Sequence, residues 1–289
     1  FKQNKINESQ LVELIKNSPE YLEHNPMVDS KITFSEKEDY SKNSRIIGMY
    51  RIKNESRWIE QSLKSISDIC EEIVILDDGS TDDTVKICKS FPNVVEIQDQ
   101  SSLAFDDTRD KNTLFQMALK QNPDFTLTLD GDEILQVDSK DLLFEELTLL
   151  YPDIPVFEFE FFYMWDKPNQ YRYDGSYSME WFRRLLRISS QSPNLKFDST
   201  DYAGNGHCPH IPQKSNGWNN YVRSRMKIFH YGYYDEELRQ KKYKFYNETQ
   251  PSPYECDNYT HTISGDGIFS GPRGIELRTL PEGQFIKDI

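Results

Sequence analysis

The segment Phe125-Thr-Leu-Thr-Leu-Asp130-Gly-Asp132-Glu133 decides how this chain is interpreted, because it has the pattern of an apolar strand that ends in three carboxylates. Like charges gathered at a strand end repel one another and lose solvation, so such a cluster costs folding free energy. A divalent cation that also binds an anionic phosphate is the commonest means of neutralising the cluster. The segment therefore predicts metal-dependent chemistry on a nucleotide.

Strand-like runs alternate with helical patterns over the first half of the chain. The strands are expected at residues 45–50, 72–76, 94–97 and 124–129. The helices are expected after an N-cap at Ser56, at 84–91 and at 107–121. Strands that alternate with helices of this length imply an α/β fold with a doubly wound, mostly parallel sheet and right-handed crossovers.

The pattern changes after the carboxylates. A helix is expected at 139–150, and strands at 156–165, 184–188 and 225–231, separated by loops rich in Asn, Gly, Pro and Tyr. A loop-rich α+β half suits a substrate-specific surface that is grafted onto a nucleotide-binding half. We therefore divide the chain into an N-terminal extension, a nucleotide-sugar-binding half, an acceptor half and a tail that folds back, at 1–44, 45–138, 139–250 and 251–289.

The net charge limits which partners the protein can bind, and the cysteine content indicates the redox state of its compartment. A formal net charge of −14 argues against nucleic acid or an anionic membrane as the main partner, so an anionic substrate needs a metal or well-placed arginines. Four widely spaced cysteines without a CxxC pair favour reduced thiols. No run approaches the roughly 20 apolar residues of a transmembrane helix, so none is expected. We expect a cytoplasmic location and, because the sequence begins at Phe1, a piece of a longer multidomain protein.

Two polar turns follow the first two strands, where open α/β sheets bind their ligands. A strand-end aspartate can accept the imide N–H of uracil or bind a ribose. Ordinary turn chemistry and helix capping are the alternative for these turns. Arg109 could reach a diphosphate, the alternative being an arginine on a helix surface. The residues expected to contact the nucleotide are Tyr50, Arg51, Asn54, Glu55, Asp77, Asp78, Arg109, Asp130 and Gly131.

The metal ligands are expected to centre on the Asp-x-Asp pair. Either Asp130 or Asp132 can bind the ion directly while the other contacts ribose or a metal-bound water, the alternative being a solvated acidic loop. His230 ends a predicted strand as the aspartates do, and His207 lies in a glycine-rich segment. Both histidines are candidate ligands, although a single histidine is more often structural. The expected cofactor is Mn²⁺ or Mg²⁺.

The order of these motifs resembles family 2 glycosyltransferases of the GT-A fold over residues 45–135. Segments 163–175, 205–209 and 230–235 also resemble parts of bacterial-type members. The resemblance implies an inverting hexosyltransferase whose donor is a nucleoside diphosphate sugar and whose acceptor is a hydroxyl of a glycan, protein or small molecule. UDP is favoured, while GDP and dTDP stay open. By the same resemblance, Arg51, Asn54 and Asp78 fall where the family contacts the nucleoside, and Asp130 and Asp132 match its metal-binding motif.

Inverting transfer requires a general base that deprotonates the acceptor hydroxyl. The candidate carboxylates in the second half are Asp166, Asp174, Glu180 and Asp201. We favour Glu180, at the start of a predicted strand, and then Asp166. Nearby aromatic residues suit stacking on sugar faces or a core strand equally well.

Three other functions remain open. A haloacid-dehalogenase-like phosphatase also places Asp-x-Asp after a strand, but that motif has Thr or Val where this chain has Ile134, and it usually opens its domain. A sugar-phosphate nucleotidyltransferase would carry a glycine-rich basic loop after the first strand. A non-catalytic carbohydrate- or nucleotide-binding relative would have no need of intact Asp130 and Asp132.

Overall fold

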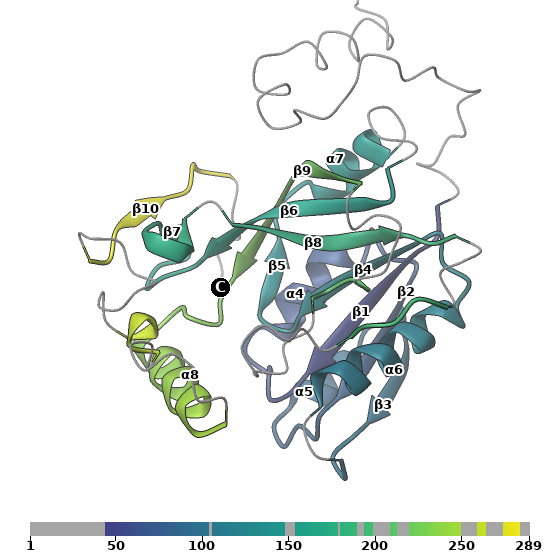
Figure 1. Cartoon of the computed structure of the whole chain (residues 1–289), viewed down its shortest axis with the longest axis horizontal. Coiled ribbons are helices and arrows are strands. Elements are labelled where there is room, and N and C mark those ends of the chain that lie inside the picture. Colours follow the sequence, from purple (N-terminus) through teal and green to yellow (C-terminus); the bar gives the residue numbers. More distant parts are fainter. Residues whose placement is uncertain are drawn as a thin grey trace, which may run out of the picture.

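The strands of the alternating pattern belong to one large sheet. The computed structural model describes residues 44–103, 106–147, 154–178, 180–189, 194–198, 209–212, 220–249, 259–263 and 274–283 (Figure 1). These residues contain an eight-stranded sheet in the order β3-β2-β1-β4-β8-β6-β9-β5. The expected N-terminal extension and most of the expected tail lie outside the described residues.

The first four strands form the predicted parallel unit. They are β1 (Ile46–Ile52), β2 (Glu72–Asp77), β3 (Val94–Asp99) and β4 (Phe125–Asp130). β1 lies between β2 and β4, and every neighbouring pair within this unit is parallel. The register places Arg51 beside Asp130, and Ile52 beside Asp77. The carboxyl ends of the strands therefore meet at one edge, where the sequence placed the polar turns.

Helices cover both faces of this unit, which confirms the doubly wound arrangement. They are α4 (Ile59–Ile66), α5 (Thr84–Cys88) and α6 (Asp107–Leu119). Successive strand residues point to opposite faces, so Ile46 packs with α4 and α5 while Ile47 packs with α6. In Figure 1, α6 lies in front of the sheet and α4 behind it. The expected N-cap at Ser56 is wrong, because α4 begins at Ile59 and the Ser56 amide instead donates to the Asp82 carboxylate (3.2 Å).

The second half of the chain extends the same sheet. Its strands are β6 (Val156–Tyr163), β8 (Glu180–Arg187), β9 (Tyr221–His230) and the short β5 (Glu133–Leu135). β8 is antiparallel to both β4 and β6, β6 is parallel to β9, and β9 is antiparallel to β5. The sheet is thus mixed, with its parallel pairs concentrated among β1, β2, β3 and β4, as in a GT-A-like α/β fold.

Smaller elements complete the described part. They are α7 (Ser139–Glu145), β7 (Gln170–Arg172), η2 (Gly175–Tyr177), α8 (Glu236–Thr249), η4 (Thr260–Thr262) and β10 (Leu277–Thr279). β7 and β10 pair in a separate two-stranded sheet. Sequence patterning did not predict β5, β7, β10 or α8.

The strand order places the carboxylates at a junction. β4 ends at Asp130 and β5 begins at Glu133, yet β8, β6 and β9 lie between these two strands in the sheet. The sheet must therefore curl to let two residues, Gly131 and Asp132, connect β4 to the far edge. The Asp-x-Asp segment is consequently where the two halves of the chain meet.

The structure bears on the expected state of the cysteines and on the expectation about membrane-spanning helices. Cys70 and Cys88 are buried free thiols, as expected, whereas Cys208 and Cys256 lie outside the described residues. Among the helices that the structure describes, none has the length and apolar character needed to cross a membrane.

Candidate functional site

The strand-end Asp78 is held by Arg51. The Arg51 guanidinium is hydrogen-bonded to the Asp78 carboxylate and also contacts Asp107 (3.1 Å) and Asp110 (3.0 Å) at the start of α6. Burial raises the pKa of Asp78, and the neighbouring Arg51 opposes that rise. The Asp78 side chain keeps 18% of its surface exposed, so an oriented carboxylate is presented at the sheet edge. This geometry suits a donor group such as an imide N–H.

Asn54 and Asp77 shape the two turns around Asp78. The Asn54 side chain, on a residue with φ of 56°, accepts a hydrogen bond from the Thr81 amide (2.8 Å). Asp77 accepts from the Ser80 amide at 3.1 and 3.2 Å, which is turn chemistry. Both residues lie at the expected site, and their side chains tie the turns together.

Tyr50 is not part of the site surface. Its side chain is fully buried in the core cluster, and its hydroxyl lies 3.0 Å from Ser62 Oγ. The expectation of a nucleotide contact by the Tyr50 side chain is therefore wrong. The physical reason is the alternation of β1, which turns Tyr50 towards α4 and Arg51 towards the opposite face.

Arg109 lies on the first turn of α6 and is bound to its neighbour. Its Nε and Nη2 atoms lie 2.8 and 2.6 Å from Asp110 Oδ1, and 35% of its side chain is exposed. Contact between Arg109 and a diphosphate stays a prediction.

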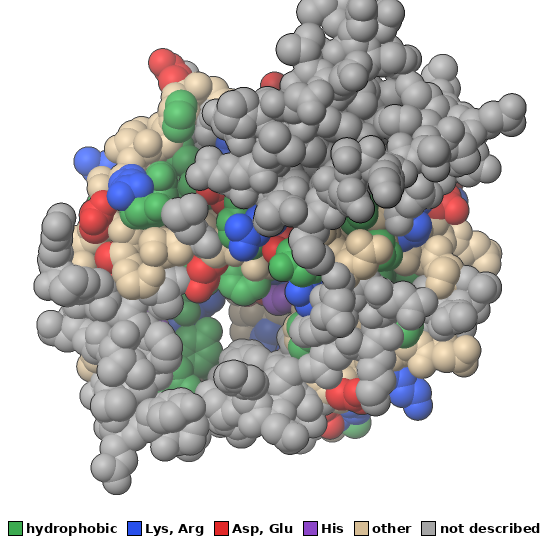
Figure 2. Space-filling model, turned by 45° about the horizontal axis from the view of Figure 1, so that its top comes forward, with side chains coloured by type: hydrophobic (Ala, Val, Ile, Leu, Met, Phe, Trp, Pro, Cys, Tyr) green, Lys and Arg blue, Asp and Glu red, His purple; other side chains and the backbone are tan. Residues whose placement is uncertain are grey.

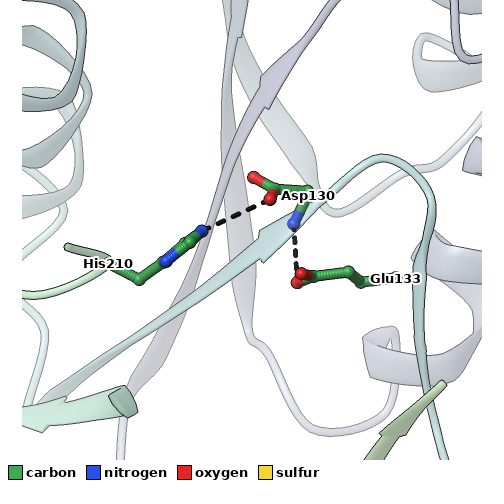
Figure 3. Close-up of side chains that lie close together, drawn as sticks. All are labelled: Asp130, Glu133 and His210. Atoms are coloured by element: carbon green, nitrogen blue, oxygen red, sulfur yellow. Dashed lines mark hydrogen bonds and ion pairs between the residues drawn. The ribbon is translucent and has the colours of Figure 1, made fainter. Parts of the chain in front are cut away.

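Asp130 is contacted from two sides, as Figure 3 shows. His210 Nε2 lies 3.3 Å from its carboxylate, while Glu133 Oε2 accepts from its backbone amide at 3.0 Å. Acceptor atoms of the three residues lie within 4.8 Å of one another. Burial lowers the pKa of His210 to about 3, helped by Arg184 and Lys111, so its imidazole is neutral at pH 7 and can donate a lone pair.

His210 was missed by the sequence patterning, which selected His207. The two histidines stand three residues apart, and His207 lies outside the described residues. The paired spacing His207-Cys-Pro-His210 was the available signal, since either histidine could serve one site.

Asp132 forms a second, buried group with His230 and Lys242. Its Oδ2 atom lies 3.4 Å from His230 Nε2 and 3.3 Å from Lys242 Nζ, and those two nitrogens are 3.5 Å apart. Gly232 leaves room for this convergence, because a Cβ there would lie 2.2–2.6 Å from the same three atoms. The structure thus brings Asp132 and His230 together as the sequence predicted, and adds Lys242 from α8.

The charge states suit a divalent cation. Burial raises the pKa of Asp132, but Lys242 and His230 outweigh it and hold that pKa well below its ordinary value. Burial raises the pKa of Asp130, but the hydrogen bond with His210 and the charge of Arg184 outweigh it, so this pKa is also well below its ordinary value. Burial lowers the pKa of His230, which leaves a neutral imidazole. Two carboxylates and neutral imidazole nitrogens are a donor set that Mn²⁺ accepts readily, and Mg²⁺ with more water ligands.

Glu133 links Arg184 to the backbone of the Asp-x-Asp turn. Its Oε1 atom accepts from Arg184 Nη2 at 2.6 Å, and the two side chains are 1% and 2% exposed. Burial raises the pKa of Glu133 to about 8, and Arg184 opposes the rise. Because its other oxygen binds the Asp130 amide, Glu133 positions the Asp-x-Asp turn. Its oxygens are committed to that task and we do not count it as a metal ligand.

Glu55 packs against the same turn. A Cβ at Gly131 would lie 2.6 Å from Glu55 Cγ, so the glycine permits the close approach of Glu55. Burial and the charge of Asp132 raise the pKa of Glu55 to about 9. The structure therefore places Glu55 and Gly131 beside the metal-ligand candidates.

The favoured general base, Glu180, is linked to His230 through Tyr163. Glu180 accepts a hydrogen bond from the Tyr163 hydroxyl, and the Tyr163 ring lies 5.5 Å from the His230 ring, centroid to centroid. Burial raises the pKa of Glu180, which suits a carboxylate that takes a proton. Asp166 instead pairs with Arg239 of α8 at 2.9 Å and is about half exposed.

The structure does not support Asp174 or Asp201 as the general base. Asp174 is buried against Arg172 at 2.7 Å, and Asp201 lies outside the described residues. The rings of Tyr163, Tyr177 and Tyr233 lie 4.9–6.0 Å from one another, centroid to centroid, and the Tyr233 ring lies 5.4 Å from the His230 ring. In Figure 2 a hollow opens near the middle of the molecule, with histidine, basic and hydrophobic side chains visible in it.

Comparison with known proteins identifies the class to which this fold and site belong. Residues 52–207, more than half of the chain, match the family model described as glycosyl transferase family 2. The chain belongs to this glycosyltransferase family. The uncharacterized proteins Rv3786c of Mycobacterium tuberculosis and Mb3815c of Mycobacterium bovis are each 23% identical to it over 249 residues, covering 77% of this chain. The chain spans about 60% of the length of these curated relatives.

Two solved structures that resemble this chain share less sequence identity with it than these relatives do. TarS of S. aureus is 13% identical, with a TM-score of 0.37, over 75% of this chain and 41% of its own. Glucosyl-3-phosphoglycerate synthase from Mycobacterium tuberculosis, in complex with Mn²⁺ and UDP-glucose, is 21% identical with a TM-score of 0.32, over 43% of this chain and 46% of its own.

Proposed function

We propose that this chain transfers a hexose-type sugar, with inversion, from a nucleoside diphosphate donor to an acceptor hydroxyl in a metal-dependent reaction. The observation that carries the proposal is that two carboxylate–histidine pairs, Asp130 with His210 and Asp132 with His230, lie at the carboxyl edge of the parallel strands, the edge that also presents Asp78. UDP is the favoured nucleotide, because an oriented strand-end carboxylate suits the imide of uracil. Family membership supports glycosyl transfer, and sets aside the phosphatase and nucleotidyltransferase alternatives.

Each residue has a definite task in this proposal. Asp130, Asp132, His230 and His210 would hold Mn²⁺ or Mg²⁺, with His207 a further candidate. The ion, when bound, supplies positive charge that stabilises the leaving nucleotide. Asp78 orients the base, and Arg51 holds Asp78 in place. Glu180 takes the proton of the acceptor hydroxyl as that oxygen attacks the anomeric carbon from the face opposite the nucleotide.

Ligand-induced stabilisation tests the nucleotide and metal requirements. With Mn²⁺ present, UDP at a hundredfold excess over its Kd is expected to stabilise the folded chain by about 2.7 kcal/mol. That raises Tm by roughly 5–10 °C for a chain of this size. GDP and dTDP, and UDP with EDTA in place of Mn²⁺, serve as comparisons. A Tm that no nucleoside diphosphate raises would contradict the proposal.

Turnover separates the enzyme from a binding relative. Nucleotide-sugars that stabilise the chain should also be hydrolysed slowly in the presence of Mn²⁺, with release of the nucleoside diphosphate. Stabilisation by UDP together with the absence of hydrolysis and of transfer to any acceptor would favour the non-catalytic carbohydrate- or nucleotide-binding relative.

Glu180→Gln tests the general base. The substitution removes the proton acceptor but keeps the shape of the side chain, so hydrolysis or transfer is expected to fall about 10²–10⁴-fold. The Tm shift produced by Mn²⁺ and UDP should stay unchanged. Asp166→Asn is the matched control, because this carboxylate pairs with Arg239 on the exposed side. If Asp166→Asn carries the loss and Glu180→Gln does not, the base is Asp166.

A further inference from the structure

One ammonium group from outside the sheet reaches the metal-ligand candidates. Lys242, in the middle of α8, lies 3.3 Å from Asp132 Oδ2 and 3.5 Å from His230 Nε2. Its side chain is 27% exposed, whereas Lys241 and Lys244 on the same helix are 68% and 75% exposed and pair with Glu237 and Glu248. The helix therefore directs one lysine into the site and its neighbours to solvent.

The contacts of Lys242 supply the positive charge that the buried carboxylate needs. Among the described residues, Lys242 is the lysine or arginine that forms an ion pair with Asp132 Oδ2. A lysine side chain ordinarily titrates at about 10.4, so this ammonium carries its charge at pH 7. It neutralises Asp132 from the same side as His230, across Gly232.

A divalent cation on Asp132 and an ammonium in this position repel each other. Oxygen ligands bind Mg²⁺ and Ca²⁺ at about 2.0–2.6 Å, so an ion on Asp132 Oδ2 would lie within a few ångströms of Lys242 Nζ. The lysine stem is flexible and its ammonium is a compact charge with three donors. It can leave Asp132 at low cost where another anion is available. The diphosphate of a nucleotide donor is such an anion.

We propose that Lys242 is an internal counter-ion that makes metal binding depend on the nucleotide. In the metal-free chain its ammonium occupies the Asp132–His230 side of the site. When cation and nucleotide bind together, the ammonium transfers its hydrogen bonds from Asp132 to the diphosphate. A cation alone must displace the ammonium without offering it a new partner, and therefore binds weakly. This inference rests on the proposed function, since it requires a nucleoside diphosphate at the same edge.

The experiment measures Mn²⁺ binding to the full chain by the electron paramagnetic resonance signal of the free ion, with and without UDP. Titrations of Mn²⁺ into UDP without protein correct for the ion that UDP binds in solution. The wild-type chain should bind Mn²⁺ at least tenfold more tightly with UDP than without it, within the usual range of coupling between sites. Lys242→Met should bind Mn²⁺ alone on the order of tenfold more tightly than wild type, with little further gain from UDP.

Two further variants make the result specific. Lys241→Met removes an equal charge one residue away on the same helix and should behave as wild type. Lys242→Arg keeps the charge and should retain most of the dependence on UDP. A native circular dichroism spectrum and a cooperative thermal transition establish that each variant is folded.

The inference is overturned if Lys242→Met binds Mn²⁺ alone no more tightly than wild type, or if UDP strengthens Mn²⁺ binding equally in both. These outcomes leave the proposed function intact, because UDP and Mn²⁺ still bind. Failure of UDP to stabilise wild type or any variant contradicts the proposed function itself.

Discussion

Asp132→Asn is expected to reduce metal-dependent turnover of a nucleotide-sugar about 10²–10³-fold, which is the usual loss when one group that stabilises developing charge is removed. The amide keeps the shape of the side chain but carries no charge for the ion. Asp132 is 6% exposed and faces His230 and Lys242, so solvent cannot replace it. The measurement is the initial rate of nucleoside diphosphate release at saturating Mn²⁺, accompanied by the Mn²⁺ affinity.

Asp99→Asn provides the matched control for this variant. Asp99 also ends a parallel strand of the same sheet, and its carboxylate accepts from the nearby Ser101 amide (2.7 Å). Its substitution should leave turnover within about twofold, as expected for a surface change away from the site. A folded Asp132→Asn chain that turns over at the wild-type rate would remove Asp132 from the proposed ligand set.

At pH 9, where the Glu133 carboxyl is mostly ionised, Arg184→Met is expected to lower the free energy of unfolding by about 3–5 kcal/mol, because it leaves this buried carboxylate without its cation. Denaturant unfolding measures this loss. Arg278→Met removes an exposed arginine that pairs with Glu276 and should cost about 0–1 kcal/mol. Adding Glu133→Gln to Arg184→Met should restore much of the stability, since the buried charge is then gone.

The loss caused by Arg184→Met should depend on pH. The pKa of Glu133 is raised to about 8 in the folded chain, above its ordinary 4.5. A group with a raised folded pKa contributes stability below its unfolded pKa and loses it as the pH rises through the folded value. Removing Arg184 takes away a group that lowers this pKa, so the deficit should be larger at pH 8 than at pH 5. An equal deficit at both pH values would contradict a role through Glu133.

The parallel unit of β1 to β4 could be predicted from sequence because its signals are local. Its strands are short apolar runs bounded by polar turns, and β1, β2 and β4 fall within two residues of their predicted bounds. α8 was missed because its sequence, Glu236–Thr249, is polar around most of its surface and has no apolar stripe with helical spacing. β5 has three residues, too few for a periodic signal.

The candidate site also has a part that the sequence predicts and a part that it does not. Asp130 and His230 end strands and Asp78 directly follows one, and these positions are visible in the sequence. The partners of the carboxylates are not, because Arg184 lies 51 residues from Glu133 and Lys242 lies 110 residues from Asp132. Only the sheet order and the packing of α8 bring such groups together. The error at Tyr50 was avoidable, since alternation along β1 assigns it to the core with Ile46 and Ile52.

The position of β5 at the sheet edge has a consequence for local unfolding. β5 pairs with β9 in a register that sets Glu133 opposite His230, and the Tyr231 amide donates to the Asp132 carbonyl at 2.8 Å. Fraying of this short edge strand would separate Asp132 from His230. A ligand that binds both side chains therefore also opposes opening of the edge, and a well-paired edge keeps the site assembled.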